Sequence, residues 1–276
     1  MSTQSSTPES VAITSRRPEF DFSNTPRIWL ADPFKTHFMN ALSVLIPYSE
    51  RTVNEIMRKN FDAVNDPTLQ GEILVLIKQE GNHAVIHKKS NDLLQQCHYP
   101  AIRFFEWLQK KSMLLIRKCS SHAFEMAIPA SFEHFTSAIS RDFLTHSKEW
   151  TGTQNNAAID FVNWHSFEEI EHQAVCYDAY KALYKSQWRL VLSLLFFWMP
   201  MTVLSTYAVQ LYFLHKDRVI YKPSNWLPYL KFIKQSIGLF TNGIFKYRHA
   251  EFKPWQTNDQ VLYECHLAKH QPGLAK

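Results

Sequence analysis

The chain has 276 residues, of which 45% are hydrophobic, so it is long enough for one large domain or two small ones with a sizeable core. It contains 6 Gly against 20 Phe, 11 Tyr and 8 Trp, and its apolar runs are long, which favours helices over a turn-rich β protein. The formal net charge is +5 and is not concentrated in one run. This charge pattern argues against nucleic-acid binding but does not exclude contact with a membrane surface.

The beginning of the chain shows neither a secretory signal nor a helical pattern. Residues 1–15 are polar and rich in Ser and Thr, without the apolar core of a signal peptide. We expect residues 1–28 to form a disordered or extended N-terminal arm. The chain has 4 Cys but no C-x-x-C pair, which is typical of reduced thiols in a cytosolic-facing protein and argues against a zinc–thiolate site.

Four long segments then show apolar residues at helical spacing. They cover residues 36–64, 67–96, 100–145 and 157–186. Pro47 bends the first segment and Pro129 interrupts the third, while Asp66 and Pro67 suit the N-cap and first position of the second. We expect residues 29–186 to form an all-α bundle.

The character of the chain changes after this bundle. Residues 190–214 contain no charged side chain, and a helix of this length, at about 1.5 Å per residue, spans a bilayer core of about 30 Å. One hypothesis is a single transmembrane or in-plane helix, which would give membrane association on the cytoplasmic side and a lipid-like substrate. The other is a helix that is buried within the protein or at a dimer interface. Because residues 226–245 are amphipathic, we expect residues 187–250 to pack on the bundle or in a membrane, followed by a polar tail over residues 251–276.

The pattern Glu-x-x-His occurs twice, at Glu80-Gly-Asn-His83 and at Glu169-Ile-Glu-His172, each inside a helical segment. Each copy places a carboxylate and an imidazole one turn apart on the same face. Two such helices, with one Glu from each of two further helices, form the ligand set of helix-bundle di-iron and di-manganese proteins.

The other helical segments contain the two additional carboxylates that this ligand set needs. Glu50 lies on the first segment, and the third contains both Glu125 and Glu133, between which pattern alone does not choose. Four carboxylates would balance two divalent ions, which explains how so many Glu residues lie in an apolar bundle. Without metal, their mutual repulsion should raise some of their pKa values.

Three further residues lie near the two Glu-x-x-His faces. His165 lies one turn before Glu169 on the same face, and Glu168 flanks that face. His87 follows the first pattern by one turn and is a ligand, an outer neighbour of a ligand or a surface residue. The chain has no His-Glu-x-x-His zinc-protease helix, no Gly-x-Ser-x-Gly elbow and no phosphate-binding Gly-rich loop.

The chain resembles the bacterial family of predicted metal-dependent hydrolases over roughly residues 16–240. The resemblance rests on short motifs, namely Arg16-Arg-Pro-Glu-Phe-Asp-Phe22, His37-Phe-Met-Asn-Ala-Leu-Ser43, Gln79-Glu-Gly-Asn-His83, Phe132-Glu-His-Phe135 and Trp164-His-Ser-Phe-Glu-Glu-Ile-Glu-His172. It implies metal-dependent hydrolysis, and the Phe-Glu-His-Phe motif favours Glu133 over Glu125 as a ligand.

The order of the candidate ligands is also similar to that of ferritin-like di-iron carboxylate oxygenases, the arylamine N-oxygenases in particular. In both, a Glu precedes Glu-x-x-His by about thirty residues, a lone Glu follows, and His-x-x-x-Glu-x-x-His ends the series. This second resemblance implies a ferritin-like four-helix bundle, extended here by a long apolar and an amphipathic helix. It implies seven ligands: Glu50, Glu80, His83, Glu133, His165, Glu169 and His172.

Three hypotheses follow for the function. The first is an O2-dependent oxidase or oxygenase that holds two divalent ions, iron before manganese or zinc, uses an electron donor and acts on a small apolar or lipid-like substrate. The second is a hydrolase in which a hydroxide bridging two metal ions attacks an ester or amide. The third is a metal-binding protein without catalysis. Paired Glu-x-x-His motifs on bundle helices favour the first hypothesis.

Overall fold

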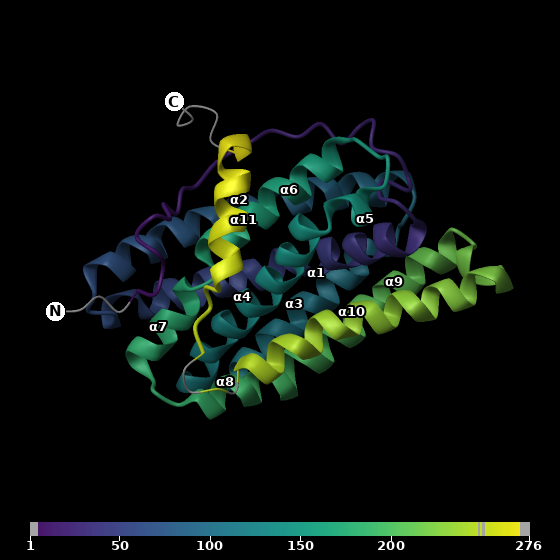
Figure 1. Ribbon diagram of the computed structural model, residues 1–276. Helices are drawn as coiled ribbons and strands as arrows, with labels where there is room; N and C mark the ends of the chain where they lie inside the picture. The colour runs from purple at the N-terminus through teal and green to yellow at the C-terminus, as the bar shows by residue number, and fades with distance from the viewer. Residues whose placement is uncertain (1–4, 248, 250–251, 271–276) are drawn as a thin grey trace.

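The computed structural model describes residues 5–247, 249 and 252–270 (Figure 1). Over these residues all regular structure is helical and no strand occurs, so the prediction of an all-α protein is confirmed. Of the disordered or extended arm that we expected over residues 1–28, the structure describes residues 5–28; these and residues 29–32 contain no helix and run along the surface of the helical body. The predicted division of the chain into domains stays a prediction.

Four helices form the centre of the molecule: α1 (Pro33–Asn60), α2 (Pro67–Cys97), α4 (His122–Thr145) and α6 (Ala157–His172). Helix α1 packs along α2, and α4 packs along α6. The sequence places a side-chain cap at the start of each, because Asp32, Asp66, Ser121 and Asn156 accept hydrogen bonds from backbone N–H groups of the first turn. These caps set where each helix begins.

Two of the predicted segments are each divided into two helices. Residues 100–145 form α3 (Ile102–Cys119) and α4, and the Ser121 hydroxyl caps the second of them. Residues 157–186 form α6 and α7 (Val175–Leu183). The predicted interruption at Pro129 is absent, since Pro129 lies inside α4. The chain turns at Ser120 and Ser121, which end α3 and cap α4. Serine favours such a helix start over the interior of a helix, because its hydroxyl can bond to backbone N–H groups.

The apolar segment 190–214 is not one regular α-helix. It spans the end of α8 (Gln187–Ser193), a π-helical stretch η2 (Leu194–Val203) and most of α9 (Leu204–Lys216). Among the described residues, no helix is both long and apolar enough to cross a bilayer. One face of α9 packs on α1, where Gln210 donates a hydrogen bond to the Phe34 carbonyl, while its other face lies at the surface. The hypothesis of a single transmembrane helix over residues 190–214 therefore finds no support in the described helices, and membrane association stays a prediction.

Two further long helices follow α9, and both contact α4. Helix α10 (Trp226–Tyr247) runs beside α9 as the expected amphipathic helix, and α11 (Thr257–His270) forms in the segment expected to be a polar tail. Tyr263 of α11 stacks on Phe167, and Arg141 pairs with the buried Asp259. These tertiary contacts explain a helix that the local pattern does not predict. The short elements are η1 (Phe61–Ala63), α5 (Ser147–Thr151), η3 (Val219–Tyr221) and η4 (Pro223–Asn225).

Phe38 of α1 joins the centre of the molecule to its outer helices. Its ring is fully buried and lies 5.4 Å from the ring of Phe232 on α10 and 6.3 Å from that of Trp150 on α5. We expect Phe38→Ala to lower the free energy of unfolding by about 3–5 kcal/mol, because it leaves a cavity where three helices meet. The matched substitution Phe104→Ala, at a position that is 57% exposed, should change it by less than about 0.5 kcal/mol.

Denaturant unfolding of the two variants measures both values. An equal loss of stability in both would contradict the packing described for α1 and α10.

Candidate metal centre

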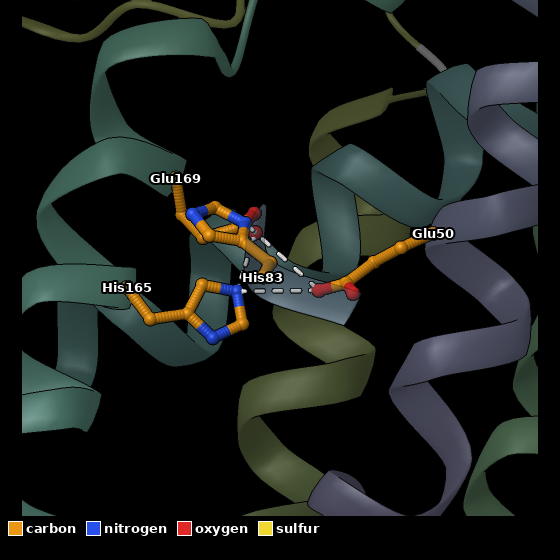
Figure 2. Close-up of side chains that lie close together, drawn as sticks. All are labelled: Glu50, His83, His165 and Glu169. Atoms are coloured by element: carbon orange, nitrogen blue, oxygen red, sulfur yellow. Dashed lines mark hydrogen bonds and ion pairs between the residues drawn. The ribbon is translucent and has the colours of Figure 1, made fainter. Parts of the chain in front are cut away.

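Three helices bring the first group of candidate ligands together (Figure 2). Glu50 extends from α1, His83 from α2, and His165 and Glu169 from α6, and one donor atom of each lies within 4.8 Å of the others. His165 Nε2 lies 2.8 Å from Glu169 Oε1 and 3.7 Å from Glu50 Oε1. His83 Nδ1 lies 3.7 Å from Glu169 Oε1.

A second group forms beside the first and shares Glu169 with it. Glu80 of α2, Glu133 of α4 and His172 of α6 complete this group, again with donor atoms within 4.8 Å of one another. His172 Nε2 lies 2.9 Å from Glu133 Oε2 and 3.4 Å from Glu80 Oε1. The structure thus brings together the seven residues that the ligand order implies, and that they bind metal stays a prediction.

Glu125, the sequence alternative to Glu133, lies outside both groups. Its carboxylate accepts hydrogen bonds from Lys59 at 2.6 Å and from Arg117 at 3.1 Å. These two cations hold the pKa of Glu125 below its ordinary value, although partial burial acts in the opposite direction. Glu125 is therefore an ordinary ion-paired carboxylate, and Glu133 is the α4 residue that faces the centre.

The donor atoms of the two groups are suited to bind metal ions, because most of them make no hydrogen bond within the described part of the protein. Glu50, Glu80, Glu133 and Glu169 are each at most 1% exposed, as are His83 and His172. Among the described residues, no hydrogen bond is made by either carboxylate oxygen of Glu50, Glu80 and Glu133, or by Glu169 Oε2, His83 Nδ1 and His172 Nε2. Unsatisfied buried carboxylates are costly, so three of them beside the half-satisfied Glu169 form a place that suits cations.

The second nitrogen of each imidazole is held by a residue outside the two groups. His83 Nε2 donates to Glu168 Oε2 at 3.1 Å, and His172 Nδ1 donates to Gln79 Oε1 at 3.1 Å. These bonds leave His83 Nδ1 and His172 Nε2 facing the carboxylates, which is the orientation that a metal-binding imidazole needs. Glu168, which the sequence placed beside the ligand face, is therefore an outer partner of a ligand.

A chain of hydrogen bonds sets the orientation of His165 in the same way. The Ser43 hydroxyl donates to Asn91 Oδ1 at 2.9 Å, so it accepts from His87 Nδ1, also at 2.9 Å. His87 Nε2 then accepts from His165 Nδ1 at 2.9 Å, which leaves the Nε2 lone pair of His165 facing Glu50 and Glu169. Burial and the charges of His165 and His83 hold the pKa of His87 well below its ordinary value, so His87 is neutral and suited to accept this bond.

Arg16 and Gln79 support the centre from outside and were missed by the sequence analysis. Arg16 binds Glu168 at 3.1 Å and Glu171 at 2.7 Å, and its backbone N–H also donates to Glu168. Gln79 links His172 to Glu171. Both residues lie in the quoted family motifs, but spacing alone does not show that Arg16, in a segment without helical pattern, reaches α6.

Burial and mutual repulsion shift the pKa values of the clustered carboxyl groups. Burial, followed by the charge of Glu169, raises the pKa of Glu80 to about 8. Burial, followed by the charge of Glu80, raises the pKa of Glu133 to about 8, and the pKa of Glu50 is raised well above its usual range by burial and Glu80. Without a cation, the centre therefore retains protons at neutral pH.

We expect Glu133→Gln to lower the metal content of the purified protein from two ions to one or none per chain, since the amide removes a charged donor of similar size. Glu125→Gln is the matched control on the same helix and should keep both ions. Elemental mass spectrometry of the two purified variants measures the difference. Retention of both ions by Glu133→Gln would exclude Glu133 as a ligand.

We also expect metal affinity to rise with pH up to about pH 8, because Glu80 and Glu133 must lose protons when a cation binds.

The same two groups should make the stability of the metal-free protein depend on pH. The pKa values of Glu80 and Glu133 in the folded protein lie above those of the unfolded chain. The stability that these groups give the metal-free protein is thus complete below their unfolded pKa and is lost as pH rises through about 8. Thermal unfolding of metal-free protein from pH 6 to 9 should show this loss in the wild type but less of it in Glu133→Gln. Identical pH slopes would contradict the account.

Comparison with known proteins bears on the same residues. The sequence model of a family described as predicted metal-dependent hydrolases matches residues 14–258, a span that contains both groups and Arg16. No curated protein and no solved structure gives a significant match. Because the match covers most of its length, the chain belongs to the family of predicted metal-dependent hydrolases.

Proposed function

We propose that this protein is a dinuclear metal-dependent hydrolase that acts on an apolar substrate. The observation that carries the proposal is the pair of buried His/Glu groups that share Glu169, next to an apolar cavity. Membership of a family described as metal-dependent hydrolases supports this reaction class.

The cavity has a volume of about 180 Å³ and lies between α1, α2, α4 and α6. His165 lines it, so the group that contains His165 is the one next to the cavity. Most of the other lining side chains are apolar or aromatic, among them Met39, Leu42, Ile46, Phe132, Ile139 and Phe161. An elongated apolar substrate with one reactive polar group suits this lining, with the polar group at His165.

Two bound divalent ions would lower the pKa of a water molecule and polarise a substrate carbonyl. The protein's own groups have three tasks around them. His87, Gln79 and Glu168 hold the three imidazoles in the orientation for binding. The hydroxyls of Thr136 and Ser166 line the cavity and offer hydrogen bonds to a polar substrate group, and the apolar walls exclude water from the rest of the chain.

A second candidate function is an O2-dependent di-iron oxidase or oxygenase, and a specific observation favours it. Glu-x-x-His motifs on α2 and α6 and single Glu residues on α1 and α4 are the donor set of ferritin-like di-iron carboxylate proteins. Under this alternative, α1, α2, α4 and α6 are a ferritin-like four-helix bundle, the metal is iron, and an electron donor is needed.

One assay distinguishes the two reactions. Metal-free protein is loaded with zinc, manganese or iron and given aliphatic esters and amides of increasing chain length in isotopically labelled water, with and without O2. We expect product that contains oxygen from water, formed without O2 and with at least one metal that is not redox-active. Product that contains oxygen from O2, formed only with iron and a reductant, would instead support the oxygenase.

The substitution Ala158→Phe makes the assay specific for the cavity. Ala158 lines the cavity and is 6% exposed, so a phenyl group at this position fills part of it. We expect this variant to keep both metal ions and to lose activity on long substrates more than on short ones. Equal activity on all chain lengths would exclude the cavity as the substrate site.

A further inference from the structure

Large hydrophobic side chains are exposed on one group of neighbouring helices. Most of those in the described part of the chain lie on α3, on the continuous rod α8–η2–α9 and on α10. We call these the apolar face: Phe104, Trp107, Leu108, Leu114, Leu115, Trp188, Leu192, Leu195, Leu204, Leu211, Trp226, Leu227, Leu230 and Ile237. Trp188 is 70% exposed and Leu204 is 69% exposed. Exposed apolar surface of this extent marks an interaction site.

The helices of the apolar face lie side by side. The Tyr212 hydroxyl of α9 accepts a hydrogen bond from the Ala101 backbone N–H at the start of α3, and the rings of Tyr212 and Phe105 are 5.3 Å apart. On the other side of α9, Tyr207 bonds to Ser236 of α10 at 2.7 Å. Figure 1 shows α9 and α10 running together along one side of the molecule. We call α3, α8–η2–α9 and α10 together the outer layer, in which α9 contacts the beginning of α3 on one side and α10 on the other.

The exposed residues point away from this layer on the same side. Leu204 and Leu211 on α9 are seven residues, or two turns, apart, and so are Leu230 and Ile237 on α10. On α3, Phe104 and Leu108 are one turn apart, opposite the buried Gln109 and Met113. Because the inner side chains pack on α1 and α4, these rows form the outer surface of the layer.

The exposed charged side chains around the apolar face are basic. Residues 101–121 contain one acidic residue, Glu106, and residues 179–250 contain one, Asp217. Glu106 is buried, and the Asp217 side chain is 7% exposed and pairs with Arg27 and His37. Exposed cations accompany the apolar rows instead: Lys110, Lys111, Lys118, Arg189, Lys231 and Lys234. Two copies of this face would repel each other, whereas an anionic surface would attract it.

We propose that the apolar face docks in the plane of an anionic phospholipid bilayer. Its Trp, Phe and Leu side chains insert to the depth of the headgroups, and the neighbouring Lys and Arg side chains bind lipid phosphates. This mode of binding needs no membrane-spanning helix, and the uncharged segment 190–214 contributes one surface of it.

The cavity opens next to this face. Its exposed lining residues are Ser23, Pro26, Arg27 and His98. Arg27 binds Asp217, which directly follows α9, so the opening lies at the end of the apolar face. An apolar substrate dissolved in the bilayer would reach the opening without crossing water. This access route rests on the proposed function, whereas docking on the bilayer does not.

Vesicle flotation tests the docking independently of any activity. We expect wild-type protein to float with vesicles that contain phosphatidylglycerol and to bind much less to phosphatidylcholine alone. The double variant Leu204→Glu/Leu230→Glu should reduce binding at least tenfold. Its matched control is Val85→Glu/Val261→Glu, at positions that are 60% and 58% exposed on α2 and α11, and it should bind as the wild type does.

A second pair of variants tests the charge. Lys231→Gln/Lys234→Gln should weaken binding to anionic vesicles about fivefold per lysine removed, and Lys78→Gln/Lys148→Gln on other helices should not. Circular dichroism and metal content establish that each variant is folded.

Three results would overturn the proposal. The first is wild-type protein that ignores anionic vesicles. The second is equal loss of binding in the control variants. The third is a stable dimer without vesicle binding that Leu204→Glu/Leu230→Glu separates, because this would make the face a contact between two copies. If docking holds but no apolar substrate is transformed, only the proposed function fails.

Discussion

The burial of four carboxylates at one point is the constraint on which the rest of this structure depends. Glu50, Glu80, Glu133 and Glu169 come from the four central helices and lie almost without solvent. The four carboxylates would repel one another unless protons or cations balanced their charge. Two divalent ions would balance this charge fully and would connect α1, α2, α4 and α6 through the same few atoms, so we expect metal binding to stabilise the bundle.

The residues that surround the candidate ligands hold the three imidazoles in place. Each of the three imidazoles is held at its second nitrogen by Gln79, His87 or Glu168, and Arg16 holds Glu168 in turn. Because Arg16 lies in the segment before α1, that segment is part of the centre's support. The family match begins at residue 14, well before the first helix, and therefore includes this segment.

Helical periodicity predicts the four central helices, because it depends on short-range geometry within a helix. The spacing of Glu and His predicts the two Glu-x-x-His faces, and the resemblance to di-iron carboxylate oxygenases implies the full set of seven clustered residues. Spacing alone could not choose between Glu125 and Glu133, which lie two turns apart. The Phe-Glu-His-Phe motif favours Glu133, and the structure shows Glu125 paired with Lys59 and Arg117. The sequence could not predict α11, since Tyr263 and Asp259 find their partners more than ninety residues away. An uncharged run is equally typical of a spanning helix and of one with an inner and an outer apolar face, so the sequence left both interpretations of residues 190–214 open.

The binding of two metal ions at the shared carboxylate Glu169 is the central prediction for this protein. Anomalous X-ray scattering from crystals of metal-loaded protein tests that prediction most directly. We predict two anomalous peaks about 3.5–4 Å apart. One should lie among Glu50, His83, His165 and Glu169, and the other among Glu80, Glu133, Glu169 and His172. A single peak, or peaks away from Glu169, would contradict the dinuclear centre.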